Sequence, residues 1–284
     1  MIDPGWKRRR QSRRRPAGKP GTPAASPGRS FGRVAAQYDL GRPSWPAAAI
    51  DLAAGELELA PDAAVLDLGA GTGKLTRLLV ERFAQVVAVE PDDAMRALIP
   101  ARADAHAGRA ENIPVRDAAV AAVFCGESFH WFDWPAAIAE IVRVLQPSGG
   151  LVLMWNRPSG GLLNSADWPP GVSDALDRLV DPAPPERRYD SFAWRDARAG
   201  SAFGELRSEV VPNGGEIDRE RLIARVASWS QVASLPDGDR DAFVAEVAGY
   251  LTEPTYAVTL ETHVYWARLK GGSRPGRSPR SRNP

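Results

Sequence analysis

Three glycines at alternating positions are the residues in this sequence best suited to bind a ligand. They lie in the segment Asp67-Leu-Gly69-Ala-Gly71-Thr-Gly73, which follows a short apolar run and precedes residues at helical spacing. Glycine has no Cβ atom, so a turn built from it can pass close to a ligand. Glu90 ends the next apolar run, at a separation from which an acidic side chain can accept hydrogen bonds from both ribose hydroxyls. Together these residues predict a nucleoside-binding site.

The glycine spacing disfavours a dinucleotide-binding motif and excludes a P-loop. A dinucleotide fingerprint needs its third glycine three residues after the second, where this chain has Lys74. A P-loop needs four residues between its glycines and a Ser or Thr after its lysine, but Leu75 follows Lys74. Taken alone, the glycines are also compatible with a tight strand-to-helix turn that binds nothing.

Short apolar runs alternate with helical spacing through the first half of the chain. Strands are expected at 64–68, 86–89, 104–107, 119–125 and 151–155, with helices at 44–58, 74–83, 93–99 and 135–145. Ser44 is expected to cap the first of these helices. The alternation predicts a doubly wound α/β fold with a mainly parallel sheet. Strands expected at 205–211 and 256–266 would complete a mixed seven-stranded sheet, the latter as an edge or antiparallel strand.

The charge distribution separates a central domain from two basic tails. The first thirty residues hold nine Lys or Arg against one Asp, and residues 270–284 hold five against none. We expect 1–30 and 270–284 to be disordered, because they lack apolar periodicity. The tails could hold nucleic acid or acidic membrane, or simply be solvated. Residues 31–269 are expected to form one domain, with a helical cap insertion at about 157–255 that includes helices at 174–179 and 218–228.

Composition also limits the location and the metal chemistry of the chain. No run of about eighteen uncharged apolar residues exists, and the basic N-terminus does not look like a signal peptide. A cytoplasmic protein without a membrane span is therefore expected. Cys125 is the only cysteine and lies in an apolar run, so we expect neither a disulfide nor a metal site.

Several segments together resemble the class I S-adenosylmethionine-dependent methyltransferases. Within this class the likeness is to the type 11 small-molecule branch, which includes trans-aconitate methyltransferase-like proteins. The matching segments are the glycine motif, Val86-Val-Ala-Val-Glu-Pro-Asp-Asp-Ala-Met95, Gly108-Arg-Ala-Glu-Asn-Ile-Pro114, Ser128-Phe-His-Trp-Phe-Asp133 and Glu140-Ile-Val-Arg-Val-Leu-Gln-Pro-Ser-Gly-Gly150. The resemblance implies a Rossmann-like fold, S-adenosylmethionine as cofactor, and methyl transfer to a small molecule with a carboxylate or hydroxyl group.

The resemblance also implies which residues hold the cofactor. Asp67 would order the turn and contact the amino group, and Glu90 would hold the ribose. Relatives often have an Asp that reads the adenine amino group where this chain has Arg109, so the Ala110 backbone or the Glu111 side chain would take over. Alternatively, Glu111 points to solvent or to a helix end. The full predicted cofactor set is Asp67, Gly69, Ala70, Gly71, Gly73, Glu90, Pro91, Met95, Ala110, Glu111, Gly126, Glu127 and Ser128.

Four residues are candidates for contact with the methyl acceptor. His130 could take a proton from a hydroxyl or hydrogen-bond a carboxylate, or it could be a buried histidine bonded to a backbone carbonyl. Trp131 could line an apolar pocket or fill core space. Tyr38 and Arg42 would belong to a lid over the cofactor, or to ordinary surface contacts. Methyl transfer needs alignment and exclusion of water more than a dedicated base.

Two other functions remain open from the sequence. A nucleic-acid methyltransferase could use the basic tails, but the acidic central part lacks a conspicuous basic face and the Asn-Pro-Pro-aromatic motif of amino-group DNA methyltransferases is missing. Nucleic acid is therefore not the expected substrate. A sensor or scaffold could bind S-adenosylmethionine without catalysis.

Overall fold

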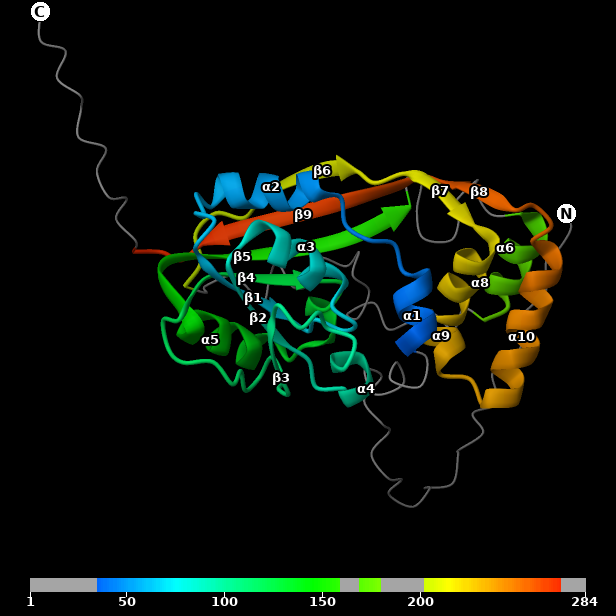
Figure 1. Cartoon of the computed structure of the whole chain (residues 1–284), viewed down its shortest axis with the longest axis horizontal. Helices are drawn as coiled ribbons and strands as arrows, with labels where there is room; N and C mark the ends of the chain where they lie inside the picture. The colour runs from blue at the N-terminus through cyan, green and yellow to red at the C-terminus, as the bar shows by residue number, and fades with distance from the viewer. Residues whose placement is uncertain (1–34, 159–168, 180–201, 272–284) are drawn as a thin grey trace, which may run out of the picture.

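The computed structural model describes residues 35–158, 169–179 and 202–271. Seven strands form the main sheet in the order β3-β2-β1-β4-β5-β9-β6 (Figure 1). The strands are β1 (Ala64–Leu68), β2 (Gln85–Val89), β3 (Asp104–His106), β4 (Val120–Gly126), β5 (Leu145–Pro158), β6 (Arg207–Pro212) and β9 (Leu260–Arg268). The strands from β3 to β5 are parallel, and β9 is antiparallel to both β5 and β6. The expected mixed, doubly wound sheet is therefore confirmed.

Helices cover both faces of this sheet, because successive side chains of each buried strand point to opposite sides. The helices of the sheet domain are α2 (Ala47–Glu56), α3 (Lys74–Arg82), α4 (Asp93–Arg96) and α5 (Trp134–Val144). Val65 packs in the cluster that includes α2 and α3, whereas its neighbour Leu66 packs in the cluster that includes α5. In Figure 1, α2 and α5 accordingly lie on opposite sides of the strands.

A second group of helices packs around its own apolar core beyond β5. Its elements are α6 (Pro170–Asp177), β7 (Gly215–Asp218), α8 (Arg219–Ala227), α9 (Ser230–Ala233), α10 (Asp237–Tyr250) and β8 (Thr255–Val258). Buried residues that include Leu222, Phe243 and Leu251 form this core, and β7 pairs with β8 in a separate two-stranded sheet. We call these six elements the cap.

The N-terminal helix α1 (Ala35–Gly41) packs against the cap (Figure 1). Gly41 sits directly on the backbone of α8: a Cβ atom there would lie 2.0 Å from the amide nitrogen of Arg225. No side chain larger than hydrogen fits, so glycine permits this helix crossing. Helix α1 is thus joined to the cap by contact and to the sheet domain by the short linker that leads to α2.

Some local expectations from sequence are wrong. Ser44 does not cap the helix that follows, because the helix begins at Ala47 and the cap position belongs to Pro46. The expected strand 256–266 is two strands, β8 and β9, in different sheets. The helix expected at 174–179 runs over Pro170–Asp177 instead, and α10 was not expected. The expectations of disorder for residues 1–30 and 270–284 lie outside the described residues, apart from Lys270 and Gly271. The Lys270 amide donates to the Ala202 carbonyl at 2.6 Å, so the expected tail does not begin at residue 270.

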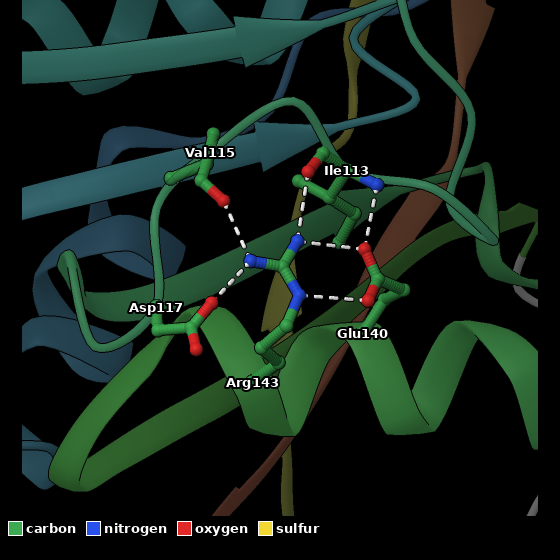
Figure 2. Close-up of polar contacts among 5 residues, drawn as sticks. All are labelled: Ile113, Val115, Asp117, Glu140 and Arg143. Atoms are coloured by element: carbon green, nitrogen blue, oxygen red, sulfur yellow. Dashed lines mark hydrogen bonds and ion pairs between the residues drawn. The ribbon is translucent and has the colours of Figure 1, made fainter.

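Arg143 on α5 fixes the loop between β3 and β4, as Figure 2 shows. Its guanidinium donates to both carboxylate oxygens of Glu140 at 2.7 Å, to the carbonyls of Ile113 and Val115 at 2.8 Å, and to Asp117 at 2.7 Å. Glu140 also accepts from the Ile113 amide at 2.8 Å. The hydrogen bonds from Arg143 hold the pKa of Glu140 below its ordinary value. The two side chains thereby clamp a loop that has little secondary structure of its own.

Replacing Arg143 with Met should reduce the free energy of unfolding by about 2 kcal/mol, because two partly buried carbonyls lose a charged donor. Urea unfolding would measure the change. Arg102→Met is the matched control, since Arg102 pairs with Glu81 on the exposed surface and its loss should cost less than about 0.5 kcal/mol. Equal losses in the two variants would contradict a special role for Arg143.

Candidate functional site

The three glycines after β1 all adopt the left-handed backbone conformation. Their φ angles are 72° at Gly69, 58° at Gly71 and 81° at Gly73. A Cβ on Gly69 would lie 2.6 Å from that of Ser128, and one on Gly73 would lie 2.9 Å from Pro100. At Gly71 the nearest atom is the Met95 methyl carbon, at 3.5 Å. Gly69 and Gly73 are therefore required by the fold itself, whereas at Gly71 the backbone conformation, not a close contact, favours glycine.

Glu90 joins this turn to the turn after β2. Its carboxylate accepts hydrogen bonds from the amides of Gly71 at 2.8 Å and Asp92 at 2.9 Å. The side chain is almost completely buried, and burial raises its pKa despite these two donors. A carboxylate at the carboxyl end of β2, beside a left-handed glycine turn, is the group needed to receive ribose hydroxyls. The predicted pair of glycine turn and acidic strand end is thus in contact.

Asp67 is buried at the end of β1, where it accepts a 2.6 Å hydrogen bond from the hydroxyl of Thr76. Burial raises the pKa of Asp67 to about 7, Thr76 opposes this, and the negative charge of Glu90 adds to it. Thr76 is itself fully buried on α3 and was not among the predicted site residues. An isolated threonine at helical spacing gives no signal in sequence that would have identified it.

Helix α1 and the cap meet α4 close to the glycine turn. Tyr38 packs in a cluster with Ala35, Met95 and Ala233, so the N-terminal helix, α4 and the cap meet there. Burial raises the pKa of the Tyr38 hydroxyl, and the charges of Glu127 and Glu90 raise it further against the effect of Arg42. Tyr38 thus packs where α1, α4 and the cap meet, and its role as a lid residue stays a prediction. Pro91, by contrast, is exposed.

The loop after β3 uses Glu111 for its own structure. Glu111 accepts from the Asp133 amide at 2.9 Å, at the start of α5, and lies 3.5 Å from the Arg109 guanidinium. Of the two alternatives for this side chain, contact with a helix end is the one observed. Ala110 is buried, and its backbone is left as the predicted contact to adenine.

The segment after β4 returns to the glycine turn. The Ser128 hydroxyl donates to the Leu68 carbonyl at 2.8 Å, which ties the start of η2 (Phe129–Trp131) to the end of β1. Gly126 lies against Trp45, where a Cβ would come within 2.8 Å of the ring. Glu127 has a φ of 53° and accepts from the Asn156 amide at 2.8 Å. Sequence inspection missed Asn156, which lies just beyond the expected fifth strand.

His130 does not have the properties expected of a general base. Its Nδ1 accepts a 3.3 Å hydrogen bond from the indole N–H of Trp155. Burial, with the positive charge of Arg42, lowers the pKa of His130 to about 3. The imidazole is therefore neutral at physiological pH, with its proton on Nε2. Trp131 is 40% exposed, so it does not fill core space, the alternative considered for it.

Arginine side chains surround Glu127 where the cap meets the sheet edge. Burial raises the pKa of Glu127, and the charges of Arg42, Arg157 and Arg225 pull it back. Arg42 stacks 5.1 Å from the centre of the Tyr38 ring and donates to the Ser228 carbonyl at 3.2 Å. Its Nε atom is buried without a hydrogen-bond partner. Arg225 is only 8% exposed. Three arginines of the described residues thus act electrostatically on Glu127.

Two negative findings concern the residues that the structure describes. Among them, no group of three or more His, Cys, Asp or Glu side chains could hold a metal ion. None of their helices combines the length and apolar character that a membrane span needs.

Comparison with known proteins assigns the family. The model of the type 11 methyltransferase domain matches residues 66–153. An uncharacterised methyltransferase-like protein of Schizosaccharomyces pombe is 33% identical over 224 residues, which are 77% of this chain and 84% of that protein. An uncharacterised methyltransferase of Mycobacterium tuberculosis H37Rv is 50% identical over 159 residues, or 54% of this chain and 61% of the relative.

A solved structure shows the same fold. It is a protein from Anaeromyxobacter dehalogenans named as a type II methyltransferase, with a TM-score of 0.58 and 24% identity, and the match covers 80% of this chain and 97% of that one. This chain belongs to the class I S-adenosylmethionine-dependent methyltransferases. It is an enzyme, and S-adenosylmethionine is its cofactor. The left-handed glycine turn and the buried carboxylates of Asp67 and Glu90 fit this cofactor, which carries a ribose and an ammonium group.

Replacing Gly71 with Val should abolish binding of S-adenosylmethionine, measured by calorimetry, because the side chain would project from the turn beside Glu90. The left-handed φ should cost about 1–2 kcal/mol of stability, so the variant should remain folded by circular dichroism. Gly55→Ala on α2 is the control, since nothing lies within 4 Å of its added Cβ. Retained affinity in Gly71→Val would place the cofactor elsewhere.

The titration of Asp67 predicts a pH-dependent stability difference. The pKa of Asp67 is about 7 in the folded chain and about 3.8 when unfolded. Between these pH values the folded state binds more protons than the unfolded state, so the free energy of unfolding of the wild type falls as pH rises. Asp67→Asn cannot titrate. The free energy of unfolding of Asp67→Asn minus that of the wild type should therefore be larger at pH 7.5 than at pH 4.5. Urea unfolding at both pH values tests this, and a constant difference would contradict it.

Proposed function

We propose that this methyltransferase acts on a small molecule and that the accepting group is a carboxylate. The observation that carries the proposal is the buried Nε atom of Arg42, which has no hydrogen-bond partner in the described part of the chain. A buried donor without a hydrogen-bond partner is costly unless a ligand supplies an acceptor. Arg42, with a buried and unpartnered Nε, is well suited to bind a carboxylate.

The neutral state of His130 favours the same class of acceptor. A hydroxyl acceptor must lose its proton during transfer, and His130 would need a vacant basic nitrogen to take it. Its Nδ1 is occupied by Trp155. A carboxylate needs no base, because it already carries the attacking lone pair at neutral pH. Of the two roles considered for His130, hydrogen bonding to a carboxylate is therefore the better supported.

The roles of the other site residues belong to the same proposal. The glycine turn from Gly69 to Gly73 runs beside the methionine part of the cofactor, Asp67 receives its ammonium group, and Glu90 receives the ribose. Met95 and the Ala110 backbone bound the adenine, with Pro91 at the exposed margin. When bound, the cofactor supplies an electrophilic methyl group on a sulfonium. The sulfonium end of the cofactor is flanked by Gly126, Glu127 and Ser128. The acceptor is surrounded by Tyr38, Arg42, His130 and Trp131.

The chain contributes alignment and exclusion of water to this reaction. Methyl transfer is an in-line displacement, so its rate depends on holding the attacking oxygen opposite the leaving sulfur. Helix α1 and the cap exclude solvent, and Arg42 spans both parts through its contacts with Tyr38 and Ser228. The narrower likeness to trans-aconitate methyltransferase-like proteins and the cytoplasmic location remain predictions that accompany this proposal.

A screen of candidate acceptors tests the acceptor class. It compares mono- and polycarboxylates with the matching alcohols and measures transfer of a labelled methyl group from S-adenosylmethionine. We expect methyl esters from carboxylates, and a raised KM for the acceptor, by about tenfold or more, in Arg42→Met. Arg82→Met is the control, because Arg82 forms an exposed pair with Asp51 on α2. Transfer only to alcohols, or unchanged kinetics in Arg42→Met, would reject the carboxylate proposal.

A further inference from the structure

The indole of Trp155 lies where it can control the chemistry of His130. Trp155 lies near the carboxyl end of β5 and is 1% exposed. Its ring meets that of Tyr265 edge to face, with centroids 5.7 Å apart and an interplanar angle of 73°. A buried indole N–H needs an acceptor, and here the acceptor is Nδ1 of His130 at 3.3 Å. The strand and the aromatic contact therefore fix the direction from which His130 receives a hydrogen bond.

The turn that carries His130 is fixed as well. The Trp131 amide donates to the Ser128 carbonyl at 2.9 Å, and the indole of Trp134 donates to the Phe129 carbonyl at 3.0 Å. Ser128 in turn donates to the Leu68 carbonyl, directly before the glycine turn. The imidazole is thus tied to the end of β1 on one side and to β5 on the other.

A nitrogen that accepts a hydrogen bond carries no proton, so in a neutral imidazole the other nitrogen is protonated. An indole, unlike a backbone carbonyl or a carboxylate, is a donor only. A histidine oriented by a carbonyl or carboxylate at Nδ1 presents a basic Nε2, which is the arrangement of a general base. Trp155 reverses that arrangement, because it leaves Nε2 as a donor.

We propose that Trp155 is a positioning residue that fixes His130 as a hydrogen-bond donor toward the methyl acceptor. This inference rests on the proposed function, in which the acceptor binds beside His130. A donor at this point can orient an anionic oxygen and cannot remove a proton from a neutral one. Trp155 would thereby help to select a carboxylate over an alcohol, without touching the acceptor itself.

Nuclear magnetic resonance tests the inference directly, through long-range correlation of the proton and nitrogen signals of histidine side chains. The chain has three histidines, and variants at His106 and His263 would assign the remaining signal to His130. In the wild type we expect an unprotonated Nδ1 and a protonated Nε2 at pH 7. In Trp155→Phe, which keeps an aromatic ring but loses the donor, we expect a measurable population with the proton on Nδ1.

Trp134→Phe is the matched control, because it removes another indole hydrogen bond from the same turn and keeps the one from Trp155 to His130. The tautomer of His130 in this variant should equal that of the wild type. A protonated Nδ1 in the wild type would overturn the inference, whether or not Trp155→Phe folds. So would a wild-type tautomer in a folded Trp155→Phe variant, or the same change in both variants. Calorimetry with S-adenosylmethionine and the acceptor screen test the proposed function separately, since the tautomer is measured without either ligand.

Discussion

The hydrogen bonds that Glu90 accepts from Gly71 and Asp92 hold together the two turns of the predicted cofactor site. Each turn follows a parallel strand, and neither has a regular hydrogen-bond ladder of its own at that point. The carboxylate satisfies one amide in each turn from a nearly solvent-free position, and in a low-dielectric setting such charged hydrogen bonds are strong. The same carboxylate lies near Asp67, whose pKa is raised mainly by burial and further by the negative charge of Glu90.

The proposed acceptor side of the site depends on a different constraint, the close crossing of α1 and α8. Gly41 lets the two helix backbones touch, and this brings Tyr38 and Arg42 over the edge of the sheet. Asn156 anchors the linker before α2 to the sheet. Its side-chain oxygen accepts hydrogen bonds from Thr262 at 2.6 Å and Asn213 at 2.9 Å. The Asn213 side chain also donates to the Ser44 carbonyl at 2.9 Å. The linker between α1 and α2 is therefore anchored to the sheet, while α1 itself belongs with the cap.

The sheet domain could be predicted well because its signals are local. Apolar runs such as Ala64–Leu68 are buried on both faces, and the glycines at 69, 71 and 73 occupy backbone conformations that other residues adopt only at a cost. The cap was predicted less well. Helix α10 has weak amphipathic periodicity, and the strand 256–266 divides at Thr259 because β8 pairs with β7 and β9 with the main sheet.

By itself, the sequence determined the order of strands and helices along the chain, the glycine turn and its acidic partner Glu90. Each of these follows from residue type and spacing along the chain. Only the tertiary structure decided the hydrogen-bond partners of His130 and Arg42. The proton on His130 is set by Trp155, which is 25 residues away along the chain, and Arg42 meets the Ser228 carbonyl across 186 residues. Such contacts depend on where separate elements cross, and no spacing within a single segment encodes that geometry.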